Sequence, residues 1–295
     1  MRNLLSANFL RLRKSALFWG TLVFMIGYAL WQIRFWAAFR QNTIDLMIFD
    51  YAGIVGSVAA VWSSLFLGAD YSDGTLRNKL VAGHARKTIY FANMVTNIAV
   101  ALLQCAAYLA VTFSLGILLV GPPTLGIGRI LSLIAGTLVM VVAFCAIFTA
   151  IGMLCPYKAA AAVVCIAGSF MLFGYMSSVD SYLNIPEYAV RTDTQGDQTI
   201  VSFERNDGYV SGTRRAVFEF LDNVLPSGQA VQYMRNRHRE ADPILADALS
   251  EAQMEEVLQH TRPEVAPLPL IAYSLAVTAA ATAVGLLLFQ RKNLK

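Results

Sequence analysis

Side chains that could do chemistry gather in one short run, residues 68–87, which read GADYSDGTLRNKLVAGHARK. The run places a carboxylate, a tyrosine hydroxyl and several basic groups between two long apolar segments. Its end, GHARKT at residues 83–88, matches a phosphate-binding loop only in part, because Arg86 occupies the place of the glycine before the lysine. We therefore predict that the chain does not hydrolyse ATP and is not itself an enzyme.

The positions of the histidines and cysteines do not favour a metal site or redox chemistry. The histidines are scattered, and His238 beside Glu240 lacks the spaced partners that a metal site needs. The cysteines stand in or beside apolar stretches, so we interpret them as small buried hydrophobes rather than a disulfide framework. No metal or cofactor is expected on this chain. The histidines are His84, His238 and His260, and the cysteines are Cys105, Cys145, Cys155 and Cys165.

The elements that carry these residues are predicted to be membrane helices. Of the 295 residues, 57% are hydrophobic and only 14% are charged, whereas soluble domains have about 25% charged residues. The mean hydropathy is +0.54. A spanning helix needs about 20 mainly apolar residues, and the composition predicts an all-α polytopic membrane protein. Six stretches are long enough: 15–33, 46–69, 88–120, 130–154, 159–177 and 268–290.

Charged residues are missing from the middle of these spans, since Asp50 and Asp70 stand at the edges of the second one. Ion-coupled carriers need a titrating group within the membrane, and intramembrane hydrolases need a nucleophile with its base or metal ligands. Both classes are therefore disfavoured.

The orientation follows from the excess of lysine and arginine in cytoplasmic loops. With both termini cytoplasmic, the inner segments carry 12 basic residues and the short outer loops carry three. The region 178–266 is then outside, and it holds 15 acidic residues and eight arginines, a net charge of −7. The basic charge belongs to the cytoplasmic membrane surface, so no nucleic-acid partner is expected.

The domain organisation follows from these segments. Residues 1–14 predict an amphipathic helix at the inner interface, with an ordinary basic flank as the alternative. Residues 15–177 hold the first five spans, and residues 267–295 hold the sixth span and a cytoplasmic tail. Region 178–266 is expected to be a small mixed extracellular domain, with a strand at 199–203 and helices at 214–225 and 244–260.

Residues 68–87 themselves predict a short amphipathic helix at the inner surface. Ser72 or Asp73 is expected to cap its start, and Gly83 to end it. Leu76 and Leu80 are four residues apart and share one face. The alternative is a solvated basic loop.

This run resembles the segment between the second and third spans of type-2 ABC exporter permeases, in which Gly-x-Asp-Tyr is followed by Gly-Thr, a basic residue, Lys-Leu, a glycine, an arginine and Ile-Tyr. The N-terminal MRNLLSANFLRLRKS, LPSGQAVQ at 225–232 and the terminal FQRKNLK are also similar to that family. Residues 178–224 and 233–266 show no such similarity.

The resemblance implies a permease subunit that pairs with a second permease and rests on two copies of a separate ABC ATPase, which binds ATP and Mg. Residues 1–14 would be the elbow helix, and 68–87 would carry the helix that couples to the ATPase. Leu76 and Leu80 would supply the apolar contact, and Arg77 and Lys79 the charged one. The resemblance assigns these residues to the coupling element: Asp70, Tyr71, Gly74, Thr75, Leu76, Arg77, Lys79, Leu80 and Gly83.

The alternative function is that of a membrane receptor or sensor, which would bind its ligand through region 178–266. For the exporter, Asn97 and Gln104 are candidate residues of the translocation path, although either could simply bond a neighbouring helix. The expected location is the plasma membrane. The sequence does not choose among a peptide, a drug, a lipid and a glycan as substrate, nor between a homodimer and a heterodimer.

Overall fold

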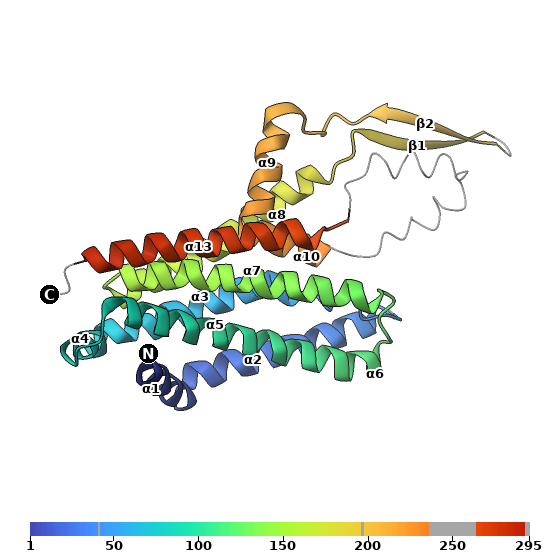
Figure 1. Cartoon of the computed structure of the whole chain (residues 1–295). Helices are drawn as coiled ribbons and strands as arrows, with labels where there is room; N and C mark the ends of the chain where they lie inside the picture. Colours follow the sequence, from blue (N-terminus) through green and yellow to red (C-terminus); the bar gives the residue numbers. More distant parts are fainter. Residues whose placement is uncertain (41, 196–197, 236–263, 293–295) are drawn as a thin grey trace.

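The computed structural model describes residues 1–40, 42–195, 198–235 and 264–292. Within them the chain is mainly helical, with one two-stranded sheet (Figure 1). The elements are α1 (Arg2–Arg13), α2 (Ala16–Ala38), α3 (Tyr51–Ser72), α4 (Thr75–Val81), α5 (Arg86–Val111), the π-helical turn η1 (Thr112–Gly116), α6 (Ile117–Leu119), α7 (Ile127–Leu154), α8 (Lys158–Leu183), β1 (Tyr188–Gln195), β2 (Gln198–Arg205), α9 (Gly212–Val224), α10 (Pro226–Arg235) and α13 (Pro267–Arg291).

Six of these helices are long and apolar enough to cross a membrane, which confirms the predicted number of spans. They are α2, α3, the continuous helix Arg86–Leu119, α7, α8 and α13. The long helices run side by side, and both chain ends lie at the same end of the bundle (Figure 1). The protein is thus an all-α multi-pass membrane protein.

The second span was expected at 46–69 but runs from Tyr51 to Ser72. Two other spans continue five or six residues beyond their predicted ends. The first was expected to end at residue 33 but continues to Ala38, and the fifth was expected to end at residue 177 but continues to Leu183. The added turns of α8 contain Asp180, whose carboxylate accepts hydrogen bonds from Asn184 at 2.8 Å and from Arg235 at 3.1 Å. Polar partners in the tertiary structure therefore allow the helix to continue beyond the apolar segment, into residues assigned to the outer domain.

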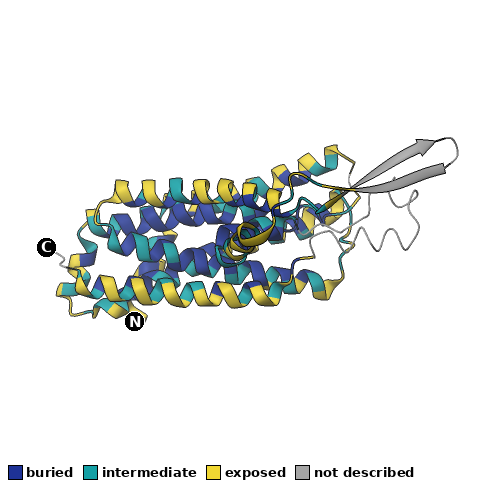
Figure 2. Ribbon diagram, turned by 90° about the horizontal axis from the view of Figure 1, so that it is seen from above, coloured by how far each residue is buried: buried dark blue, intermediate teal, exposed yellow. Residues whose placement is uncertain are grey.

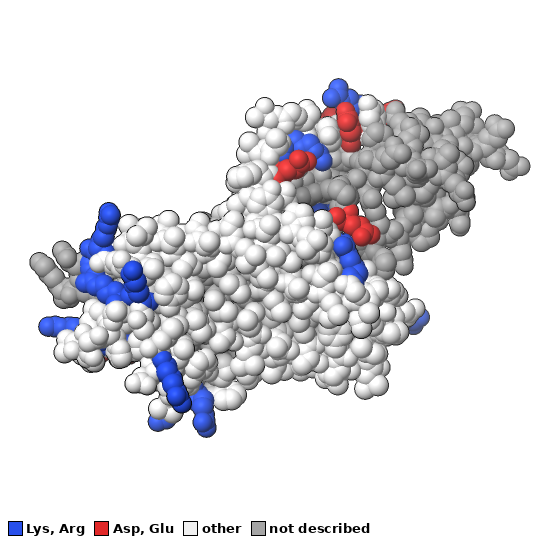
Figure 3. All heavy atoms as spheres, in the orientation of Figure 1, with Lys and Arg blue, Asp and Glu red and all other residues white. Residues whose placement is uncertain are grey.

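Charged side chains gather at both ends of the bundle, and one of these ends is almost purely basic (Figure 3). Lysine and arginine side chains gather at the end formed by α1, α4 and the C-terminus, which we call the basic end. Aspartate and glutamate side chains appear at the opposite end, near α9 and the hairpin, which we call the acidic end. The surface between them is almost free of charged side chains in this view. This is the distribution expected for a bundle surrounded by lipid.

Beyond α8 the chain forms an antiparallel hairpin in which Tyr188 pairs with Arg205 and Gln195 with Gln198. The expected strand at 199–203 lies within β2. The helix expected at 214–225 is α9, but Pro226 does more than end it, because it begins α10. Helix α10 packs into the bundle against α3, α7 and α8, and its first five residues are buried. The helix expected at 244–260 lies outside the described residues.

The core follows the bundle axis (Figure 2). Buried side chains line α3, α5 and α7, including Tyr51, Trp62 and Tyr108, whereas α2 and α8 turn exposed apolar residues such as Trp31 and Met171 outward. A second cluster at the basic end joins Leu4 and Leu12 of α1 to α3, α4 and α5. Three polar residues near the start of the third span, Asn93, Thr96 and Asn97, are fully buried and contact other helices.

Candidate functional site

Helix α4 is the element that projects from the basic end, and two glycines set its length. Gly74, with φ 67°, precedes its first residue, and Gly83, with φ 82°, follows its last turn. L-residues other than glycine rarely adopt this left-handed conformation. The N–H of His84 donates to the carbonyl of Lys79 at 3.2 Å and that of Gly83 to Leu80 at 2.9 Å, which is the Schellman pattern of a helix end.

The expectation for the start of α4 was wrong. Gly74 occupies the N-cap position and no side chain caps the first turn. The hydroxyl of Ser72 instead donates to the carboxylate of Asp73 at 3.1 Å. The left-handed turn at Gly74 replaces the extended backbone that a Ser or Asp cap requires.

The apolar face of α4 packs on its own bundle. Leu76 is 3% exposed in a cluster with Trp62 and Phe66, and Leu80 packs at the edge of the same cluster. The side chains on the exposed face are different ones: Arg77, Asn78 and Val81, of which Val81 is 81% exposed. The residues predicted to contact a partner, Leu76 and Leu80, thus attach α4 to the bundle.

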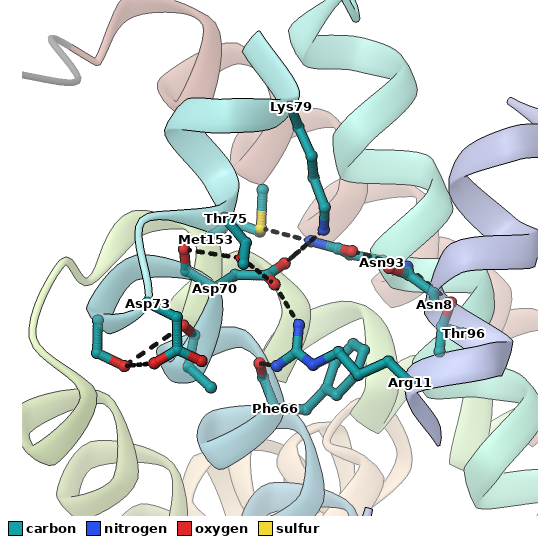
Figure 4. Close-up of polar contacts among 12 residues, drawn as sticks. Asn8, Arg11, Phe66, Asp70, Asp73, Thr75, Lys79, Asn93, Thr96 and Met153 are labelled. Carbon is teal, nitrogen blue, oxygen red and sulfur yellow. Dashed lines mark hydrogen bonds and ion pairs between the residues drawn. The ribbon is translucent and has the colours of Figure 1, made fainter. Parts of the chain in front are cut away.

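Asp70 connects α4 to the rest of the protein (Figure 4). Its carboxylate is fully buried near the end of α3 and forms ion pairs with Arg11 of α1 and, at 2.8 Å, with Lys79 of α4. It also accepts hydrogen bonds from the hydroxyl of Thr75 at 2.7 Å and the amide of Asn93 at 3.2 Å. These five residues, which we call the Asp70 cluster, join α1, α3, α4 and α5.

A second layer of contacts fixes α1. The amide of Asn8 donates to Asn93 at 3.0 Å and to the hydroxyl of Thr96 at 3.1 Å. The guanidinium of Arg11 donates to the carbonyl of Phe66 at 3.0 Å and lies 4.4 Å above the ring of that residue. Because Asn8 and Arg11 are one helical turn apart, the same face of α1 makes both sets of contacts.

The chemistry of the Asp70 cluster is structural rather than catalytic. One buried carboxylate neutralises only one of its two cations, so the cluster keeps a net positive charge. Removing one member of such a group leaves buried charge without compensation. Among the described residues no three His, Cys, Asp or Glu side chains are grouped as they would be around a metal ion.

The predicted residues separate into three groups. Asp70, Thr75 and Lys79 come together in the Asp70 cluster, whereas Arg77 points away from it. Tyr71 lies neither in the Asp70 cluster nor on the exposed face of α4. Its hydroxyl donates to the carbonyl of Met153 in α7 and accepts from the ammonium of Lys292.

Sequence reasoning missed Arg11, Asn8 and Asn93 as members of this site. A signal was present in residues 1–14, where Asn8 and Arg11 share a helical face with the apolar Leu4 and Leu12. Both leucines are buried, so polar residues on that face require buried partners.

The two candidate path residues are buried between helices. Asn97 accepts from the indole N–H of Trp62 at 3.1 Å and donates to the hydroxyl of Thr149 at 2.9 Å, which joins α3, α5 and α7. Gln104 donates to the hydroxyl of Thr21 in α2 at 2.8 Å. Both bonds are helix-to-helix contacts, so a role in a path stays a prediction.

Thr21 also lines an apolar groove on the side of the bundle. The groove has a volume of about 500 Å³ and opens between α2, α3 and α8. Its walls include Leu17, Phe24, Val58 and Phe170. Gln104 does not line the groove itself but is hydrogen-bonded to Thr21, which does.

No protein-family model matches the sequence, and no curated protein matches it either. The function is therefore inferred from the geometry of the basic end, and the permease role expected from the sequence of residues 68–87 stays a proposal.

Proposed function

We propose that the chain is the permease subunit of an ATP-driven ABC exporter in the plasma membrane, with its basic end in the cytoplasm. ATP and Mg belong to a separate ABC ATPase, of which two copies serve the complex. The chain forms the translocation path together with a second permease subunit, and α4 is its coupling helix.

The observation that carries the proposal is the way α4 is held. A seven-residue helix is too short to be stable by itself in water, yet α4 is fastened by Leu76 inside the bundle and by the ion pair of Lys79 with Asp70. Because the contacts of Leu76 and Lys79 are buried and one of them is an ion pair, we expect a displacement of α4 to move α1, α3 and α5 as well. This is the property that a coupling element needs.

The docking surface is the exposed face of α4. Val81 presents an apolar side chain at its tip, with Arg77 and Asn78 on the same side of the helix. Because Leu76 and Lys79 face the bundle, it is the exposed face of α4 that can meet another protein. We assign the ATPase contact to Arg77 and Val81, and the inward-facing Leu76 and Lys79 to holding α4 in place.

The second permease subunit has a suitable face in the groove between α2, α3 and α8. Its lining is almost entirely apolar, with hydroxyl groups from Thr21 and Ser57. A second subunit that covers this face would enclose the groove and place Thr21, with Gln104 behind it, beside the path.

The neighbouring reading frames are the first test, since the proposal requires one of them to encode an ABC ATPase, and coexpression with that ATPase is the second. Wild-type chain should retain the ATPase during purification, and the complex should move substrate at the expense of ATP. Val81→Asp and Arg77→Glu should each weaken retention about tenfold or more, as expected for central interface residues. Purified alone, the chain should turn over no ATP.

Lys87→Glu is the matched control, because Lys87 is exposed at the same end but lies on α5. It should leave retention unchanged. Retention that survives both α4 substitutions would refute α4 as the docking element, and a sensor kinase in place of the ATPase would favour the receptor hypothesis.

A further inference from the structure

The ends of three spans meet at the basic end next to the Asp70 cluster, where the amide of Asn93 also donates to the sulfur of Met153 at 3.4 Å. They are the last turn of α3 with Tyr71, the end of α7 with Met153 and Leu154, and the end of α13 with Lys292. Neighbouring residues of α3 therefore point into two different clusters, since Asp70 contacts α1, α4 and α5 while Tyr71 contacts α7 and the end of α13.

Arg86 completes the end of α13. Its guanidinium donates to the carbonyls of Phe289 at 3.0 Å and Gln290 at 3.1 Å, and also to that of Lys292. The last carbonyls of a helix lack partners within the helix and carry partial negative charge, so a cation is favourable there. Arg86 is also the first residue of α5, where a cation is unfavourable to that helix's own dipole. Its contacts thus serve α13 and not α5.

Lys292 places a cation at the last carbonyls of α7 in the same way. Its ammonium donates to the carbonyls of Leu154 at 2.9 Å and Met153 at 3.5 Å, and to the hydroxyl of Tyr71 at 2.9 Å. It also lies 4.4 Å above the Tyr71 ring. Partial burial lowers the pKa of Lys292 from its ordinary value. The residue that follows α13 therefore caps another span and contacts α3.

Close packing supports these bonds. A Cβ atom added at Gly285 of α13 would lie 2.6 Å from the Cβ atom of Ala150 in α7 and 2.4 Å from the hydroxyl oxygen of Tyr90, so α13 packs closely on α7 there and the Tyr90 side chain reaches the same place. Tyr90 is one turn beyond Arg86 on α5, and its ring also contacts Phe289. The last turns of α13 are thus held by α7 and by the side chains of Arg86 and Tyr90 from α5.

We propose that Arg86, Lys292 and Tyr71 form a terminal clamp that fastens the last span to the corner between α3 and α4, so that a displacement of α4 carries α7 and α13 with it. Arg86 and Lys292 are positioning residues in this scheme, because neither reaches the exposed face of α4. The inference rests on the proposed function for its role in transport, but the mechanical link can be tested in this chain alone.

The first experiment measures amide hydrogen exchange of the purified chain in detergent micelles. Arg86→Met should speed exchange in the last turns of α13 about tenfold, because several carbonyl contacts are lost. Lys87→Met and Arg291→Met are the matched controls, since both side chains are exposed at the same end and should leave the exchange rates unchanged.

The link itself is tested by loosening α4 and observing α13. Leu76→Ala should speed exchange in α4 and, through the clamp, about threefold in the last turns of α13. In a Lys292→Met background the effect on α13 should disappear while the effect on α4 persists. If Leu76→Ala alters exchange in α4 alone in the otherwise wild-type chain, the link is refuted and the clamp is only a pair of helix caps.

The second experiment uses the complex with the ATPase in lipid vesicles. Lys292→Met should retain the ATPase but lower the substrate moved per ATP hydrolysed by about tenfold, whereas Arg291→Met should not. An unchanged ratio would overturn the role in transport. Failure of wild-type chain to bind any ATPase would instead refute the proposed function, and the exchange measurements would still decide the link.

Discussion

Two of the buried aspartates, Asp70 at the basic end and Asp45 at the acidic end, are held by different kinds of partner. At the basic end, the partners of Asp70 include Arg11 and Lys79, which come from α1 and α4. At the acidic end, Asp45 accepts hydrogen bonds from the hydroxyls of Thr43 and Thr124 and from the backbone N–H of Thr124 at 2.8 Å. The first is an ionic junction between helices, and the second joins two loops through neutral donors.

The difference suggests different mechanical roles. The loops at the acidic end touch through backbone, since a Cβ atom at Gly121 would lie 2.1 Å from the carbonyl oxygen of Asn42. Charged contacts at the basic end instead attach a separate helix, α4, whose far face is exposed. The comparison shows that these two loops of the acidic end pack on each other through backbone, whereas the basic end holds a separate helix whose other face is exposed.

Asp70→Asn should have the largest effect. It removes the negative charge but keeps the shape, leaving two partly shielded cations without compensation, so we expect a loss of about 3 kcal/mol in the free energy of unfolding. Unfolding in mixed micelles with increasing SDS measures it. Asp45→Asn should cost clearly less, about 1 kcal/mol, because its partners are neutral. Equal losses would break the comparison.

Leu76→Ala should follow, at about 3 kcal/mol or slightly less, because a buried leucine is lost from the cluster at the basic end. The same unfolding measurement applies. Val81→Ala is the control, and it should leave stability unchanged since its side chain is 81% exposed. A similar loss for both variants would mean that α4 is oriented differently from this structure.

The glycines sharpen the comparison of backbone packing. Gly74→Ala should cost about 1 kcal/mol, because its φ of 67° is strained for alanine while the space around it is open. Gly121→Ala should cost more, about 2 kcal/mol or above, since φ is 146° there and the new methyl group would collide with the backbone of Asn42. The reverse order in the unfolding measurement would contradict the closed packing of the acidic end.

The smallest expected effect is the change in the free energy of unfolding at low pH. Burial alone would raise the pKa of Asp45, but hydrogen bonds from Thr124, Thr43 and the backbone of Leu125 outweigh it and hold the pKa below its ordinary value. A carboxylate with a lowered folded-state pKa stabilises the protein above the unfolded pKa of about 3.9 and loses that contribution as pH falls. The stability difference between wild type and Asp45→Asn should therefore shrink below about pH 4. A difference that grows in acid would show that the carboxylate is not stabilised in this way.

Much of the fold could be predicted because it depends on local composition. Apolar runs of spanning length identified six membrane helices, and the glycine after Ala82 identified the end of α4. The strand within β2 and the helix α9 also follow local patterns. Span ends were less accurate, because Asp180 ends an apolar run in sequence but finds partners in Asn184 and Arg235.

The sequence predicted which segment forms the candidate site, residues 68–87, but not which of its side chains face the bundle. Periodicity indicated that Leu76 and Leu80 share a face, yet it could not tell whether that face meets a partner or the bundle. Packing at the basic end turns Leu76 inward and leaves Val81 outside. Arg11 and Lys292 escaped prediction because their partners are tens to hundreds of residues away in the chain.

The amino-acid sequence by itself determined that this is a polytopic membrane protein with one end basic and one acidic, since the bilayer selects on hydropathy and charge, which are summed over short windows. Only the tertiary structure decided which side chains of residues 68–87 face inward and that the neighbouring Asp70 and Tyr71 find partners on different helices. The reason is physical: a buried charge or an unfilled helix end needs a partner, and the partner is supplied by whichever segment the fold brings near, not by the neighbours in sequence.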